Sequence, residues 1–95
     1  MTKHLVFVEV KAQKQLKKMS VRDQARIIGV LNTLEKEGLS ARFDIKMLRG
    51  YQRHFRIRLE EYRIRFELSA DQTIVVYSIM GMQLLRLQMP LRSTS

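Results

Sequence analysis

The chain has no cysteine, one proline and few acidic residues, and these shortages exclude several classes of protein and of chemistry. Its 95 residues include 9 Asp+Glu against 18 Lys+Arg. Without cysteine it has no disulfides, no thiolate chemistry and no cysteine-ligated zinc. No apolar run approaches the roughly 18–20 residues of a membrane span, so no membrane partner is expected. The two histidines, His4 and His54, are too few and too scattered for a metal site, and we predict neither metal nor cofactor.

The length predicts a single domain, 1–95, with one thin core, because a chain of this size buries about 60–70% of its unfolded surface. The first residues lead directly into a strand pattern and contain no signal-peptide apolar region, which favours a cytoplasmic protein. The net charge of +9 favours a nucleic acid or another acidic partner.

The first half of the chain predicts one strand followed by two helices. Residues 5–10 are apolar on both sides and rich in β-branched residues, which is typical of a covered strand. Ser20 lies three residues before Asp23, a spacing that resembles a capping box, and Gly38 suits the position just after a helix. The core positions expected on the two helices are Ala12, Leu16, Met19, Ile27, Leu31 and Leu34.

The most informative feature is a pair of runs, 54–59 and 62–68, that alternate apolar and charged residues with period two. Only Glu60-Glu61 separates them, so they predict a tight hairpin. Glutamate is unusual in such a turn. We therefore expect either a loop longer than two residues or a local slip in the register of the two strands. The direct register places Phe55 opposite Phe66 and Ile57 opposite Ile64 on the apolar face, and Arg58 opposite Arg63 and Arg56 opposite Arg65 on the charged face.

Like charges that face each other destabilise a sheet, so four stacked arginines favour a site for an anion. The alternative is a solvated face on which the nearby glutamates offset the charge. By parity His54 lies on the same face, and a histidine there is a candidate general base. Its alternative role is a cross-strand contact with Glu67. The three tyrosines are interpreted as packing or edge residues.

The remaining segments complete the predicted fold. Residues 39–53 have weak periodicity, residues 73–80 predict a strong strand that Gly81 interrupts, and residues 83–91 predict a short helix limited by Pro90. The expected class is α+β. Two N-terminal helices pack on one face of an antiparallel sheet in the order β-α-α-β-β-β, with a possible C-terminal helix.

These residues resemble the RelE/ParE superfamily of toxins from bacterial and archaeal type II toxin–antitoxin modules. The resemblance spans about residues 3–89. The matching positions are Ala12 to Leu16, Met19, Leu31, Leu34, Leu48-Arg49-Gly50, Phe55-Arg56-Ile57-Arg58-Leu59 and Tyr62-Arg63-Ile64.

The resemblance implies a RelE-like fold, neutralisation by a cognate antitoxin and, in the RelE branch, cleavage of mRNA on the ribosome. It implies that Arg56 and Arg58 hold the RNA backbone and that Arg63 offsets charge on the scissile phosphate. RelE-like enzymes carry a basic residue after the last strand and then a tyrosine or histidine. Here Arg86 is the candidate for the first, and neither tyrosine nor histidine follows Tyr77. The further RNA-binding candidates are Arg53, Arg65, Lys46 and Arg49.

Three functions therefore stay open: a ribosome-dependent mRNA endonuclease, a non-catalytic ParE-like inhibitor of DNA gyrase, and a degenerate member that only binds RNA or its antitoxin. The absence of a tyrosine or histidine after Tyr77 favours the gyrase inhibitor. The arginines retained in the two strands disfavour the degenerate member. The lysines of the first helix are interpreted as a solvated face, or as a contact for RNA or an acidic antitoxin segment.

Overall fold

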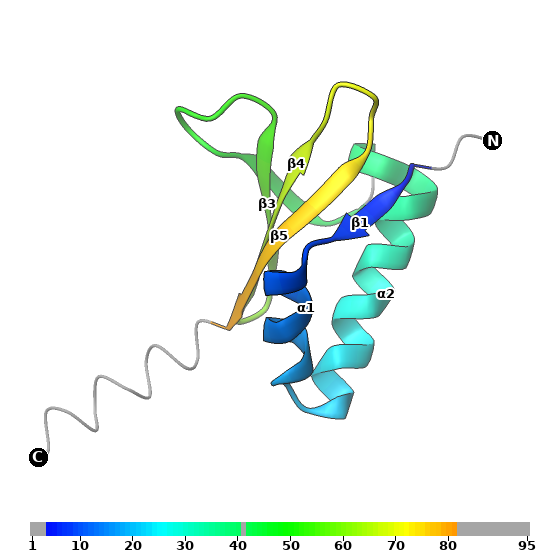
Figure 1. The fold of residues 1–95 in the computed structure, drawn as a ribbon, viewed down its shortest axis with the longest axis vertical. Helices are drawn as coiled ribbons and strands as arrows, with labels where there is room; N and C mark the ends of the chain where they lie inside the picture. Colours follow the sequence, from blue (N-terminus) through cyan, green and yellow to red (C-terminus); the bar gives the residue numbers. More distant parts are fainter. Residues whose placement is uncertain (1–3, 41, 82–95) are drawn as a thin grey trace, which may run out of the picture.

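Two helices pack against one face of a five-stranded sheet (Figure 1). The structure is a computed structural model and describes residues 4–40 and 42–81. The elements are β1 (Val6–Val8), α1 (Val10–Lys17), α2 (Val21–Glu37), η1 (Gly38–Ser40), β2 (Asp44–Met47), β3 (His54–Leu59), β4 (Tyr62–Leu68) and β5 (Ile74–Gly81). This confirms the predicted α+β class. Neither α1 nor α2 is long and apolar enough to cross a membrane.

The core lies between the helices and the apolar face of the hairpin, as the alternation predicted. Side chains from α1, α2, β3, β4 and β5 meet there with no buried polar residue among those described. The buried residues are Ala12, Ile27, Val30, Leu31, Leu34, Ile57, Ile64, Phe66, Ile74, Val76 and Ile79. No helix within residues 4–40 and 42–81 covers the opposite face of the sheet (Figure 1).

The signals at the two ends of α2 are confirmed. The Ser20 Oγ accepts a hydrogen bond from the Asp23 amide at 3.1 Å, which satisfies one unpaired donor of the first turn. At the other end Gly38 adopts a φ of 63°, and a Cβ there would meet the imidazole of His4. The positive φ favours glycine, whereas the imidazole is the end of a flexible side chain that can move aside.

The sheet differs from the prediction in three ways. Its order is β1-β5-β4-β3-β2, and β1 pairs with β5 in parallel, so the sheet is mixed rather than antiparallel. The structure has one strand more than predicted, β2, which lies within residues 39–53. Ile45 is its one half-buried residue, and the periodicity of this segment was too weak to predict a strand. The run 5–10 is not covered on both faces: only Val6–Val8 is strand, and Phe7 is 57% exposed.

Gly81 extends β5 instead of interrupting it and pairs with Tyr62. The predicted helix over 83–91, together with Arg86 and Pro90, lies outside the described residues.

The hairpin of β3 and β4 has the predicted direct register, from Leu59 opposite Tyr62 to His54 opposite Glu67. Glu60 adopts a φ of 54°, which resolves the question raised by glutamate in the turn. The loop is two residues long, and Glu60 adopts the left-handed backbone conformation although it is not a glycine. The burial of the apolar face outweighs the local preference of the turn.

A polar cluster ties this turn to α2 and thereby holds the hairpin in place. The Tyr62 hydroxyl donates a hydrogen bond to the Asp23 carboxylate. Arg26 of α2 forms ion pairs with Glu60 and, at 3.8 Å, with Asp23. The hydrogen bond to Asp23, helped by burial, raises the pKa of Tyr62 to about 12.

We expect Tyr62→Phe to destabilise the protein by about 1.5 kcal/mol at pH 8, because a hydrogen bond to a charged acceptor is lost. The pKa of Tyr62 is about 12 in the folded chain against an ordinary 10, so its stabilisation is complete below pH 10 and lost as the pH rises through 12. Urea unfolding from pH 8 to 12 should therefore bring wild type and variant together. Tyr51→Phe, which alters an exposed tyrosine, is the matched control. A gap that persists at pH 12 would contradict the assignment.

Candidate functional site

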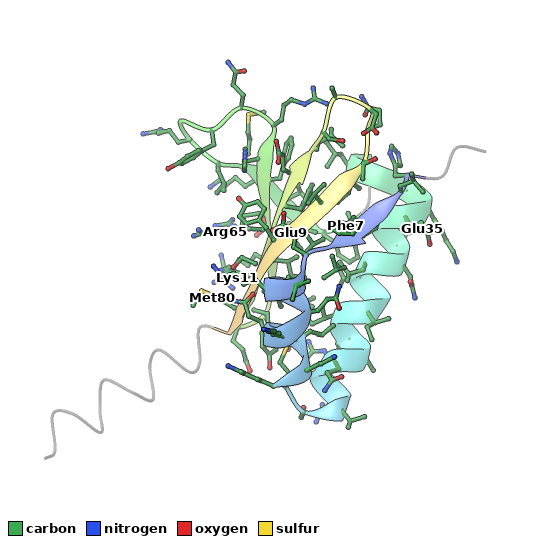
Figure 2. The ribbon with its side chains drawn as sticks, viewed as in Figure 1. Phe7, Glu9, Lys11, Glu35, Arg65 and Met80 are labelled. Carbon is green, nitrogen blue, oxygen red and sulfur yellow. The ribbon has the colours of Figure 1, made fainter. Side chains whose placement is uncertain are left out.

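The sheet face opposite the helices carries the arginine face, defined as Arg56, Arg58, Arg63 and Arg65. In the hairpin register Arg56 lies opposite Arg65 and Arg58 opposite Arg63. Figure 2 shows Arg65 projecting from the side of the sheet that faces away from α2. The predicted like-charge pairs are therefore present as directly facing neighbours.

Internal carboxylates do not neutralise the arginine face. Within residues 4–40 and 42–81 none of its four guanidinium groups forms an ion pair. Glu60 is directed to Arg26 of α2, and Glu67 lies near His54. Asp44 of β2 lies opposite Arg58 in the register without forming an ion pair with it. Two glutamates that could have offset this charge therefore lie elsewhere, since Glu60 pairs with Arg26 and Glu67 lies near His54.

The four arginines are not equivalent. Arg63 donates to the carbonyl oxygens of Glu60 at 2.8 Å and of Tyr62 at 3.0 Å, so its guanidinium lies back along the hairpin turn. The Nε of Arg56 is buried and has no hydrogen-bond partner among the described residues, which is a costly arrangement. Arg58 and Arg65 are exposed.

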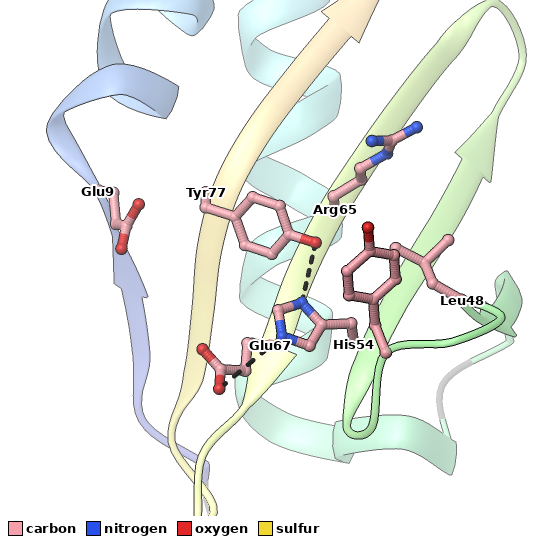
Figure 3. Close-up of a pocket in the computed structure, with 7 residues that line it drawn as sticks. Glu9, Leu48, His54, Arg65, Glu67 and Tyr77 are labelled. Atoms are coloured by element: carbon pink, nitrogen blue, oxygen red, sulfur yellow. Dashed lines mark hydrogen bonds and ion pairs between the residues drawn. The ribbon is translucent and has the colours of Figure 1, made fainter.

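A hollow of about 500 Å³ opens at the end of the arginine face that is remote from the Glu60 turn (Figure 3). Its lining comes from β3, β4, β5, the loop before β3 and the residue before α1. The lining residues are Glu9, Leu48, Tyr51, His54, Arg65, Glu67 and Tyr77. A cation, two carboxylates, an imidazole and two phenols therefore share one concave site.

A chain of three polar groups crosses this hollow. The Nδ1 of His54 lies 3.1 Å from the Tyr77 hydroxyl, and its Nε2 lies 3.9 Å from Oε2 of Glu67. The ring of Tyr77 meets His54 edge-on at 5.5 Å, and that of Tyr51 lies 5.7 Å away on the other side. Burial raises the pKa of the Tyr77 hydroxyl, an effect that the nearby Arg65 partly offsets.

A β-bulge lies at Tyr77. Ser78 pairs with Arg65 and Val76 with Phe66, so Tyr77 is the extra residue that has no partner in β4. Ile74 and Val76 are buried, so the alternation of side chains along β5 places the Tyr77 phenol on the opposite, open face. The sequence interpreted Tyr77 as a packing or edge residue, and this alternation is the signal that could have placed it in the site.

The other predicted site residues are spread more widely. Arg53 donates from Nε to the Leu68 carbonyl and from its terminal nitrogen to the Ser69 carbonyl, each at 2.7 Å, so it clamps the end of β4. Lys46 of β2 lies opposite Arg56 and extends the basic face. Arg49 lines a second hollow of about 480 Å³ in the loop before β3. No group of three potential metal ligands occurs among the described residues.

The fold and the site together define a class: a small two-layer α+β protein whose uncovered sheet face is cationic and ends in a hollow of acid–base groups. No family model and no curated protein matches the chain. Solved structures do, and all five compared are RelE toxins or RelE–RelB complexes.

The RelB-RelE antitoxin-toxin complex from Methanococcus jannaschii is similar at a TM-score of 0.73 and 25% identity, over 84% of this chain and 94% of that chain. The RelE-RelB complex from Pyrococcus horikoshii matches at 0.73 and 23% identity, over 86% and 97%. The isolated E. coli RelE toxin matches at 0.64 and 20% identity, over 82% and 83%. The chain therefore has the RelE toxin fold, as the resemblance implied.

Proposed function

We propose that this protein is the toxin of a type II toxin–antitoxin module and inhibits translation by cutting mRNA on the ribosome, in the cytoplasm. The observation that carries the proposal is the arginine face, which has no internal counter-charge among the described residues. Four guanidinium groups on adjacent strands fit the phosphates of an extended RNA strand, because each can hold two phosphate oxygens. The RelE fold supports the same reading.

The proposed roles follow from position. Arg65 lines the hollow, and Arg56 lies opposite it on the neighbouring strand. Both would bind the phosphate at the reacting centre, where they would offset the charge that develops during cleavage. Arg58 and Lys46 would hold the adjoining backbone. Arg63 would reach the phosphate only after leaving the turn carbonyls that it now binds. His54, the predicted base, lies in the hollow beside Arg65.

A cognate antitoxin is the proposed protein partner. The similar solved complexes pair a RelE chain with RelB. An antitoxin that covers the arginine face would neutralise the toxin by excluding RNA, and its contacting segment would carry acidic residues to match the charge.

Induced expression followed by primer extension on a reporter mRNA tests the proposal. We expect growth arrest and new 5′ ends inside translated codons within minutes of induction. A reporter that lacks a start codon is the control and should remain uncut, since cutting requires the ribosome. Inhibition of DNA supercoiling without mRNA cuts would overturn the proposal in favour of a gyrase inhibitor. Tight binding to a small protein with neither effect would show a toxin fold without toxin activity.

A further inference from the structure

The hollow raises a chemical difficulty for His54 as the direct base. Both of its ring nitrogens already face a protein group: Nδ1 the Tyr77 hydroxyl at 3.1 Å and Nε2 the Glu67 carboxylate at 3.9 Å. A neutral imidazole has one donor and one acceptor nitrogen. The nearby carboxylate, although beyond hydrogen-bond distance, favours the hydrogen on Nε2, which leaves Nδ1 as the acceptor for the Tyr77 hydroxyl. The lone pair that a base needs is then covered by Tyr77.

We propose that Tyr77 is the catalytic residue that touches the ribose 2′-hydroxyl, and that His54 acts through it, in the tautomer that the nearby Glu67 carboxylate favours. This inference rests on the proposed function and names its proton-transfer group. It also supplies the acid–base residue that the tail of this chain lacks. The phenol lies on the open face because the neighbouring positions along β5, Ile74 and Val76, face the core.

The proton balance of the step is complete. The 2′-oxygen attacks phosphorus while its proton passes to the Tyr77 oxygen, and the phenolic proton of Tyr77 passes to Nδ1 of His54. The bond from phosphorus to the 5′-oxygen breaks, and the 5′-oxygen leaves with a proton from water. The products are a 2′,3′-cyclic phosphate and a 5′-hydroxyl. The imidazolium beside Glu67 then returns its proton to solvent.

The groups around Tyr77 favour a neutral phenol in the resting site. Burial raises its pKa, and the carboxylate of Glu67 raises it further, whereas Arg65 lowers it. Five titratable or charged side chains share the hollow with it, from the residue before α1, the loop before β3, and β3 and β4: Glu9, Tyr51, His54, Arg65 and Glu67. Since Tyr77 keeps its proton, it relays protons to His54 and does not act as a phenolate.

The kinetic test compares Tyr77→Phe, His54→Gln and the double variant in single-turnover cleavage of mRNA on purified ribosomes. Each single variant should lose about 10²-fold in rate, and the double variant should lose no more, because the two residues act as one unit. Tyr62→Phe removes a phenolic hydroxyl outside the hollow and should cut at the wild-type rate while folded.

The outcomes separate this inference from the proposed function. If wild type cuts mRNA and Tyr77→Phe cuts it at the same rate, the relay is overturned but the proposed function is not. The same conclusion follows if the rate losses of the two single variants multiply in the double variant. Absence of wild-type cutting would overturn the function. A spectroscopic readout is independent of activity: imidazole ¹⁵N shifts at pH 8 should show His54 protonated on Nε2, with the Nδ1 signal moving in Tyr77→Phe. Protonation on Nδ1 would mean that His54 donates to Tyr77, and it would also overturn the relay.

Discussion

Replacing Arg56 and Arg65 together by glutamine is expected to lower the cleavage rate by about 10²–10³-fold or more, because each removes a fixed cation from the reacting phosphate. RNA affinity should also become less dependent on salt. Each phosphate contact to a single strand contributes about 0.7 to the slope of log affinity against log salt concentration, so losing two contacts should reduce the slope by about 1.4. Fluorescence anisotropy with a labelled oligoribonucleotide from 50 to 300 mM salt measures this slope.

The same double variant should be as stable as wild type or more stable, by about 0.2–1 kcal/mol, because the two guanidinium groups face each other across β3 and β4. Glutamine keeps part of the aliphatic stem, so little packing is lost. A loss of function with no loss of stability distinguishes a binding surface from a structural one.

The matched control removes two positive charges from α2, by Arg22→Gln and Lys36→Gln, at exposed positions outside the arginine face. We expect this variant to cut at nearly the wild-type rate and to keep most of the salt slope. Equal losses of cleavage rate in both double variants would show that cleavage depends on the net charge of the protein rather than on the arginine face. Wild-type cutting by the arginine-face variant would remove Arg56 and Arg65 from the site.

Phe66→Ala is expected to cost about 3–5 kcal/mol of unfolding free energy, the largest stability effect that we predict. Phe66 is fully buried between the helices and the sheet, and its ring stacks on Phe55 at 5.5 Å. Small domains are stable by only about 5–15 kcal/mol, so a loss of this size would leave the variant largely unfolded or close to unfolding. Urea unfolding followed by circular dichroism measures the loss.

Two variants make this result interpretable. Phe66→Leu retains most of the apolar volume and should cost less than half as much. Phe7→Ala removes an aromatic ring that is 57% exposed on β1 and should cost less than 1 kcal/mol. If Phe66→Ala cost no more than Phe7→Ala, the assignment of the core to this face of the sheet would be wrong. Phe66 also adjoins the bulge, so its loss should loosen Tyr77.

Much of the site was predictable from local pattern, because its backbone is a hairpin. The alternation of Phe55 and Ile57 with Arg56 and Arg58 assigns opposite faces to the two sets, and a two-residue turn then leaves one register that buries the apolar set. The Ser20 cap depends on contacts within a few residues and was predicted correctly for the same reason.

The sequence by itself thus determined the class of fold, the register of β3 with β4 and the facing arginine pairs, since a period of two and a cap are properties of neighbouring residues. Only the tertiary structure decided the parallel pairing of β1 with β5, the edge strand β2, the retention of Arg53 by backbone carbonyls, and the contact of Tyr77 with His54. Those features join residues up to 68 positions apart, as between Val6 and Ile74. No short pattern encodes such pairings, because they depend on how the assembled layers share one core.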